Sequence, residues 1–137
     1  METKAEKMLT VIFSEYIRKR ALARVGGCER CRNPKYDTTR EDGTTRPAYM
    51  QLQASHFYGR GNKCVKWDED NAVGLCGGCH THFHGHPREF DHWFQNHVGE
   101  ITYNWLLGRL RRRARPDVAM LMLYFRHKIR ELDDNPR

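Results

Sequence analysis

The chain has 137 residues, enough for one domain and too few for two of ordinary size. Its 39% hydrophobic and 30% charged residues are typical of a soluble globular protein, and no apolar run approaches the ~18 residues needed to cross a membrane. Lys and Arg total 24 against 17 Asp and Glu, and the net charge of +7 favours a polyanionic partner such as nucleic acid, although it also serves solubility alone. Residues 1–7 lack the apolar core of a signal peptide, so we expect a cytoplasmic protein.

The first half of the chain predicts one long helix followed by short extended segments. Residues 3–24 carry an amphipathic pattern that opens with the capping-box pair Thr3 and Glu6. Residues 32–47 are polar and rich in turn signals, which indicates a loop or a short hairpin. Residues 49–54 alternate as a strand does, and the apolar run 71–75 predicts a second strand.

The second half predicts four helices. Residues 78–84 begin the first, and Pro87 stands at the first position of the next, which ends at Val98 before Gly99. Thr102 opens a third helix and Pro116 a fourth. The last helix turns five apolar side chains inward: Val118, Leu121, Phe125, Ile129 and Leu132. The predicted architecture is helical around a two-stranded centre.

Four cysteines form two Cys-x-x-Cys pairs. They are Cys28, Cys31, Cys76 and Cys79. Thiolates at this spacing grip an ion from a tight turn, and two such turns complete the tetrahedron that zinc prefers. In a reducing cytoplasm a structural zinc is favoured over buried free cysteines or a redox pair. The fifth cysteine, Cys64, has no partner at this spacing and is expected to be a free thiol.

Histidines gather within the same region. His80 and His84 are four residues apart, so both rings project from one face of a helix and can share a cation. His56 follows the first predicted strand, where a neutral imidazole can take a proton from water. Six of the eight histidines lie between residues 80 and 97, so a polar helix surface is the alternative explanation.

The segment from Gln53 to Gly61, followed by Asp70 to His80, resembles the HNH nucleases of the ββα-metal fold. Within that superfamily it is most similar to the phage NinG/Rap recombination nucleases, which place a similar His-x-x-x-Arg-Gly before an Asn and a Cys-x-x-Cys. The stretch 80–99 also looks like phage HNH proteins. The resemblance implies one α+β domain over residues 1–137: an N-terminal helix (1–25), a zinc-stapled HNH core (26–99) and C-terminal helices (100–137).

The resemblance also implies roles for individual residues. His56 matches the general base that activates water, and Asn71 matches the asparagine that braces the loop between the two strands. His80 matches the last histidine of the motif, a ligand of the catalytic cation, and His84 would add a second ligand. We expect that cation to be Mg²⁺ or Mn²⁺ ahead of Zn²⁺ or Ni²⁺, stabilising the phosphate and the leaving oxygen. Arg60 would hold a phosphate oxygen.

One position departs from the family pattern. Many members carry Asp or His directly before the general base as a metal ligand, whereas this chain has Ser55. Three interpretations stay open: His80 and His84 hold the ion with water and substrate, the site is weak, or His56 is itself a ligand and no base remains. The rival to a nuclease is therefore a non-catalytic zinc module that binds nucleic acid or protein.

A basic run completes the candidate residues. Arg109, Arg111, Arg112, Arg113 and Arg115 fall within seven positions, a density suited to phosphate contacts along DNA. A solvated helix end is the alternative, since cations favour helix C-termini. The resemblance implies a hydrolase for double-stranded and branched DNA, acting in the host cytoplasm if phage-encoded, and leaves a homodimer open because junction cutters often use two active sites. An RNA-directed nuclease ranks last, because no feature reads a 2′-hydroxyl.

Overall fold

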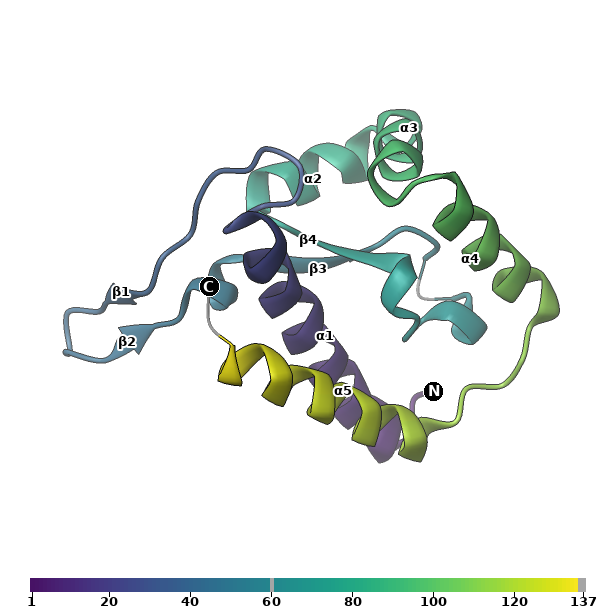
Figure 1. Cartoon of the computed structure of the whole chain (residues 1–137), viewed down its shortest axis with the longest axis horizontal. Coiled ribbons are helices and arrows are strands. Elements are labelled where there is room, and N and C mark those ends of the chain that lie inside the picture. The colour runs from purple at the N-terminus through teal and green to yellow at the C-terminus, as the bar shows by residue number, and fades with distance from the viewer. Residues whose placement is uncertain (60, 136–137) are drawn as a thin grey trace.

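The computed structural model describes residues 1–59 and 61–135. In this part of the chain the architecture is α+β, with five α-helices and two small antiparallel sheets (Figure 1). The predicted fold class is confirmed at that level. None of the helices within the described residues combines the length and the apolar character that a membrane span requires.

Helix α1 (Lys4–Val25) lies against one face of the central strands (Figure 1). Its predicted cap is confirmed, since the Thr3 hydroxyl accepts a hydrogen bond from the backbone of Glu6 at 3.1 Å. Gly26, in the left-handed conformation, ends the helix and returns its N–H to the carbonyl of Leu22. The buried face of α1 holds four large side chains in the predicted positions: Leu9, Phe13, Tyr16 and Ile17.

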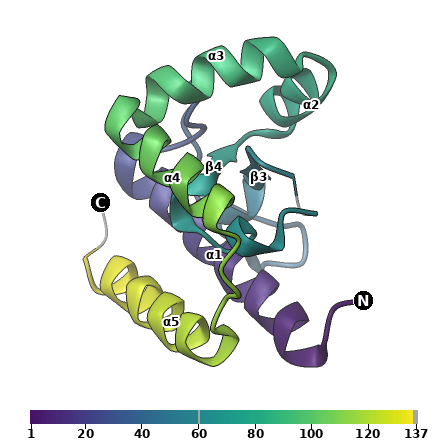
Figure 2. The same cartoon turned by 90° about the vertical axis from the view of Figure 1, so that its right-hand side faces the viewer.

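The central sheet consists of β3 (Gln53–His56) and β4 (Ala72–Leu75), which run antiparallel with His56 opposite Ala72. Helix α2 (Gly77–Gly85) follows β4 at once and contacts both strands. Figure 2 shows α2 on the opposite side of the strands from α1. A methyl group at Gly74 would come within 2.5 Å of the Ala21 side chain, so only glycine lets β4 approach α1 this closely.

The strand predicted over residues 49–54 is partly wrong. Residues Ala48–Gln51 form a 3₁₀ turn (η1), and only the last part of the predicted segment, together with Ser55 and His56, belongs to β3. Pro47 fixes the backbone angle that starts this turn, and its carbonyl accepts the N–H of Met50 at 3.1 Å. The Tyr49 ring then lies against the cationic groups of α1, which alternation alone could not reveal.

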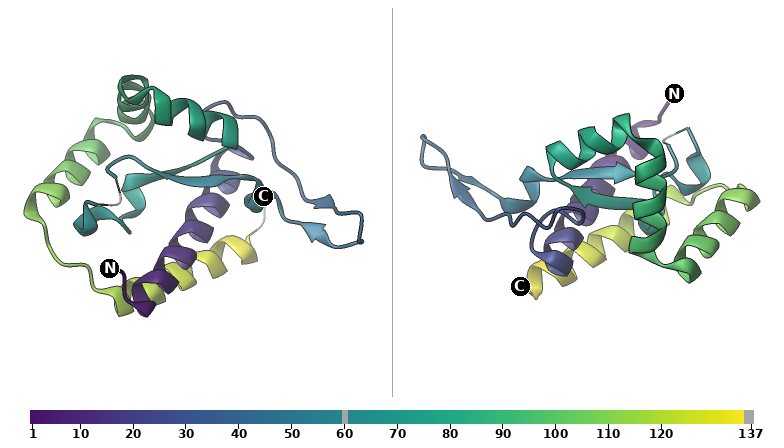
Figure 3. Two further views of the ribbon diagram at one scale, coloured as in Figure 1. Left: turned by 180° about the vertical axis from the view of Figure 1, so that it is seen from behind. Right: turned by 90° about the horizontal axis from the view of Figure 1, so that it is seen from above.

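The polar segment 32–47, predicted as a loop or a short hairpin, contains a short hairpin. Strands β1 (Thr38–Thr39) and β2 (Thr45–Arg46) pair antiparallel and project away from the rest of the molecule (Figures 1 and 3). Two further 3₁₀ turns, η2 (Lys63–Val65) and η3 (Glu69–Asn71), lie in the connection between β3 and β4.

The C-terminal helices are α3 (Pro87–Val98), α4 (Glu100–Arg112) and α5 (Val118–Asp134). Helix α4 begins two residues before the predicted Thr102. Helix α5 begins two residues after Pro116, because the Asp117 carboxylate caps it by accepting the Met120 N–H at 3.1 Å. Helix α5 lies beside α1, while α3 and α4 close over the sheet on the side of α2 (Figure 2).

The interior therefore has two apolar clusters. One lies among β4, α2, α3 and α4, and includes Leu75, Phe83, Phe94 and Leu106. The other lies between α1 and α5, where Phe13 meets Phe125 edge to face at 5.1 Å. The β3–β4 sheet contacts both clusters, since Val73 and Leu75 belong to the first and Ala72 to the second.

Candidate metal centre and histidine cleft

The four cysteines of the two pairs meet at one point. Their sulfur atoms all lie within 4.8 Å of one another, and Cys31 Sγ is 3.8 Å from Cys76 Sγ. None of them forms a disulfide. Four thiols that converge in this way fit the donor set and the tetrahedral geometry of a structural metal such as zinc. The predicted clustering is confirmed.

The first pair sits on a tight turn directly after α1. The N–H of Arg32 donates to the carbonyl of Cys28 at 2.9 Å, and Arg32 has a left-handed backbone with φ of 58°. Gly27 packs against Asn33, whose carbonyl oxygen would lie 2.1 Å from an added Cβ. The turn therefore depends on glycine at position 27 and holds both thiols on one side of the chain.

The second pair begins α2. Cys76 is the N-cap residue of that helix, and its sulfur accepts the N–H of Cys79 at 3.5 Å. Burial alone would raise the pKa of the Cys76 thiol, but the hydrogen bonds from Cys79 and the neighbouring thiols outweigh it and lower the pKa to about 7. Burial raises the pKa of Cys79 to about 12. A cation that binds the cluster would therefore displace the proton of the Cys79 thiol.

His56 ends β3, with its side chain half-buried beside Phe13. Its Nε2 lies 2.8 Å from the backbone carbonyl of Lys66. A carbonyl oxygen can only accept a hydrogen bond, so Nε2 carries the proton and Nδ1 is the basic nitrogen of the neutral ring. The connection between the two strands thus sets the tautomer of His56, through a backbone atom that no sequence motif marks.

His80 and His84 come from α2, and their ring centres are 6.1 Å apart. The buried hydroxyl of Ser55 lies 2.6 Å from Nδ1 of His80. If Nδ1 donates this bond, Nε2 of His80 is left as the nitrogen that can ligate a cation. Ser55, the residue directly before His56, thus contacts the ring of His80 on α2.

The three histidines line one cleft of about 210 Å³ at the junction of β3, α2 and the start of α3. The rest of its lining is Ser55, Leu75, Pro87 and the rings of Phe57, Phe83 and Phe90. Within residues 1–59 and 61–135, the nitrogens of His56, His80 and His84 do not converge within 4.8 Å as the cysteine sulfurs do. The cleft therefore keeps the histidines apart, with room for further groups between them.

Asn71 is fully buried just before β4. Its Oδ1 accepts the N–H of Tyr58 at 2.8 Å, and its Nδ2 donates to the carbonyls of Tyr58 and Val65 at 3.1 and 2.9 Å. These bonds tie both ends of the connection that contains η2 to the base of the sheet. Asn71 consequently makes the contacts required of a residue that braces this loop, and it is not part of the cleft lining.

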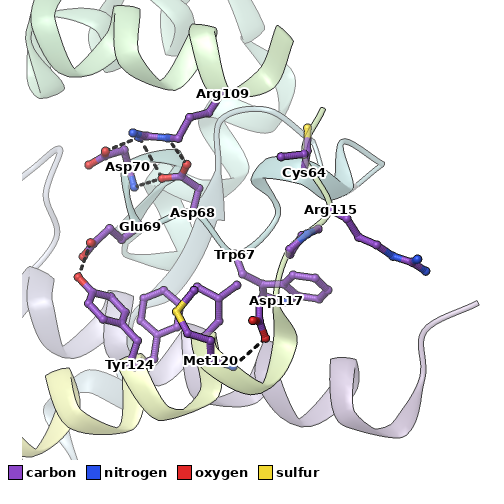
Figure 4. A pocket seen from close by; sticks show the side chains of 14 residues that line it. Cys64, Trp67, Asp68, Glu69, Asp70, Arg109, Arg115, Asp117, Met120 and Tyr124 are labelled. Carbon is purple, nitrogen blue, oxygen red and sulfur yellow. Dashed lines mark hydrogen bonds and ion pairs between the residues drawn. The ribbon is translucent and has the colours of Figure 1, made fainter. Parts of the chain in front are cut away.

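The arginines of the basic run have different surroundings. Arg109 donates from Nε to Asp68 at 2.6 Å and from Nη2 to Asp70 at 2.5 Å (Figure 4). Arg111, Arg112 and Arg113 are exposed at the end of α4. A DNA contact by Arg109 stays a prediction, with its guanidinium engaged by two carboxylates in this structure. Arg60 lies outside the described residues.

Sequence motifs did not reveal one further buried group, Glu29, which stands between Cys28 and Arg30. Its Oε2 accepts the N–H of Gly74 at 2.6 Å, and its Oε1 lies 2.8 Å from Nε2 of His97. Burial opposes ionisation, but the bonds from His97 and Gly74 prevail and lower the pKa of Glu29. The carboxylate joins the first cysteine turn to β4 and α3, residues too distant in sequence for any local pattern to link.

Cys64 is half-buried and lies 3.7 Å from the carbonyl of Leu110, away from the four clustered thiols. Comparison with known proteins adds no assignment to this geometry: no family model, no curated protein and no solved structure matches the chain.

Proposed function

We propose that this protein is a metal-dependent endonuclease of the HNH type that hydrolyses phosphodiester bonds in DNA. The observation that carries the proposal is the shared cleft, which His56 lines from β3 and the His80–His84 pair lines from α2. One imidazole with a defined tautomer can act as a general base, and two imidazoles one helical turn apart can ligate a catalytic cation.

His56 is the proposed general base. The carbonyl of Lys66 accepts from Nε2, so the neutral ring offers Nδ1 to a water molecule. The same bond stabilises the imidazolium that forms after the proton is taken, because Nε2–H remains a donor to the carbonyl. The ring is also packed against Phe13, which limits its rotation.

His80 and His84 are the proposed ligands of a catalytic divalent cation, Mg²⁺ or Mn²⁺ ahead of Zn²⁺ or Ni²⁺. Ser55 contributes by holding Nδ1 of His80, which directs Nε2 to the ion. When bound, such a cation would supply positive charge for the pentacovalent phosphate and the leaving 3′-oxygen. Water and substrate oxygens would complete its coordination, consistent with a cleft that has space between the histidines.

The four cysteines are proposed to hold a structural Zn²⁺. They would take no part in the chemistry, since all four positions around the ion are filled by sulfur. The metal would join the end of α1 to the start of α2 and so fix the helix that carries His80 and His84.

The net charge of +7 and the exposed Arg111, Arg112 and Arg113 support duplex DNA as the substrate. The resemblance to the NinG/Rap recombination nucleases extends the proposal to branched DNA, and to a homodimer that would place two clefts on one junction.

The test is a nicking assay on supercoiled plasmid with Mg²⁺, Mn²⁺, Zn²⁺ or Ni²⁺. His56→Ala should lower the rate by roughly 10²- to 10⁴-fold, the range for loss of a general base. His92→Ala, an exposed histidine on α3, is the matched control and should cut at the wild-type rate. Absence of cleavage with every metal, or full activity in His56→Ala, contradicts the proposal.

A second candidate function is a zinc-containing nucleic-acid-binding module without catalysis. The observation that favours it is Ser55, which is buried and provides a hydroxyl where a metal-binding side chain would be expected. Metal analysis separates the candidates. The nuclease requires a cation beside the cysteine-bound zinc that is lost in His80→Ala/His84→Ala. The binding module requires no cation that this double substitution removes.

A further inference from the structure

A second group of metal-ligating side chains lies where α2 turns into α3. His82, His86 and Glu89 each offer one ligand atom, and these atoms all lie within 4.8 Å of one another. None of the three lines the histidine cleft. His82 is two positions from His80 and from His84, which places it on the opposite side of α2.

The two imidazoles are held parallel. Their ring centres are 4.1 Å apart with an interplanar angle of 15°. Nδ1 of His86 lies 2.7 Å from the carbonyl of His82. Because that oxygen can only accept, Nδ1 carries the proton and Nε2 of His86 has the lone pair that a cation binds. This is the arrangement that orients histidine ligands in metal sites.

Glu89 is held by both of its oxygens. Oε2 lies 2.7 Å from Nε2 of His82, and Oε1 accepts from Nη2 of Arg30 at 3.2 Å. Arg30 is itself fixed, with Nη1 directed at the sulfur of Cys79 at 3.5 Å and its guanidinium over the Phe83 ring. One oxygen can therefore turn to a cation while Arg30 keeps the carboxylate in place through the other.

We infer that His82, His86 and Glu89 form a second transition-metal site, separate from the cysteine cluster and from the histidine cleft. Two imidazoles and one carboxylate suit borderline divalent ions such as Zn²⁺, Ni²⁺ or Co²⁺, and not Mg²⁺ or Ca²⁺, which prefer oxygen ligands alone. His86 and Glu89 are exposed, so an ion bound here is open to solvent. Its affinity should be lower than that of an ion held by the four thiolates of the cysteine cluster.

The site has a structural consequence. His82 belongs to α2 and Glu89 to the first turn of α3, with the break at His86 between the two helices. A bound ion closes this corner, and Arg30 connects it to Cys79 of the cysteine cluster. Without a metal, the hydrogen bond between His82 and Glu89 makes the same link more loosely.

The experiment uses the full chain loaded with one equivalent of Zn²⁺, in which the His80→Ala/His84→Ala substitutions remove the cleft ligands. Isothermal titration with Ni²⁺ as the probe should show one site. Adding His86→Ala or Glu89→Gln should weaken Ni²⁺ binding by at least about tenfold, because loss of an outer-shell partner alone costs roughly 10- to 100-fold. Adding His127→Ala is the control. His127 Nε2 lies 2.6 Å from the Glu131 carboxylate, but His127 belongs to neither of the groups of converging ligand atoms found among the described residues.

The inference is overturned if His86→Ala and Glu89→Gln both leave Ni²⁺ affinity unchanged. It is also overturned if the His80→Ala/His84→Ala protein that lacks these substitutions does not bind Ni²⁺. A readout without substitutions keeps it testable if a variant unfolds: the imidazole ¹⁵N resonances of His82 and His86 in the wild-type protein should shift together on addition of Zn²⁺ beyond the first equivalent. Resonances that stay in place overturn it as well. Neither measurement involves DNA cleavage, so its outcome is independent of the proposed nuclease activity.

Discussion

The cysteine cluster and the histidine cleft both draw side chains from α2, and they differ in how completely they are assembled. The four sulfurs converge within 4.8 Å and leave no position for another ligand. The cleft spreads its histidines around about 210 Å³, with His56 hydrogen-bonded to the Lys66 carbonyl and His80 to the Ser55 hydroxyl. A closed donor set suits an ion that stabilises the fold, whereas an open set suits an ion that must also meet water and substrate.

The largest expected effect comes from removing one thiol of the four-cysteine cluster. Cys76→Ser should lower the free energy of unfolding by about 5 kcal/mol or more, because zinc binding to such sites supplies folding free energy of order 10 kcal/mol. Denaturant melts combined with measured zinc content would check this. Cys64→Ser is the control: it lies outside the cluster and should keep one zinc and nearly wild-type stability.

Next is the brace beneath the cleft. Asn71→Ala should cost about 3 kcal/mol, because it removes the partner of the partly buried N–H of Tyr58 and of the buried carbonyl of Val65. Asn62→Ala removes an exposed side-chain amide in the same loop, which donates to the Gly59 carbonyl at 3.2 Å, and should cost far less. Equal thermal midpoints for the two variants would contradict a bracing role.

A smaller effect tests whether the open site depends on orientation. Ser55→Ala should lower the affinity of the cleft for its cation by roughly 10- to 100-fold, a loss of about 1.4–2.7 kcal/mol in binding free energy. The metal bound by the cysteines should stay in place. Mn²⁺ binding followed by electron paramagnetic resonance would measure it. Thr81→Ala changes an exposed hydroxyl beside His80 and should leave Mn²⁺ affinity unaltered; a loss common to both variants would argue against the Ser55 contact.

The smallest expected effect distinguishes two arginines of the basic run at the end of α4. Arg109→Ala should cost about 1 kcal/mol of stability through its pairs with Asp68 and Asp70, and should lower DNA affinity less than Arg112→Ala does, because two carboxylates already engage its guanidinium. Arg112→Ala should leave stability unchanged and reduce the slope of log affinity against log salt by about 0.9. Melting curves and salt-dependent DNA titrations of both variants would measure these effects. A stability loss in Arg112→Ala and a smaller salt slope only in Arg109→Ala would contradict the prediction.

Much of this organisation could be predicted because it depends on short sequence separations. The cap at Thr3, the Cys-x-x-Cys spacing and the apolar stripe of α5 are local patterns, and all three appear in the structure. The prediction of a strand over residues 49–54 was partly wrong for a local reason. Pro47 starts a 3₁₀ turn over Ala48–Gln51, and this turn takes up residues whose alternation is typical of a strand.

The sequence by itself determined the α+β class and which thiols would cluster, because periodicity and ligand spacing act over a few residues. Only the tertiary structure decided that Ser55 contacts His80, that the Lys66 carbonyl sets the tautomer of His56, and that Arg109 is held by Asp68 and Asp70. Those contacts join segments 10 to 41 residues apart in the chain. Their geometry arises from how the sheet, the turns and the helices pack, which no local pattern encodes.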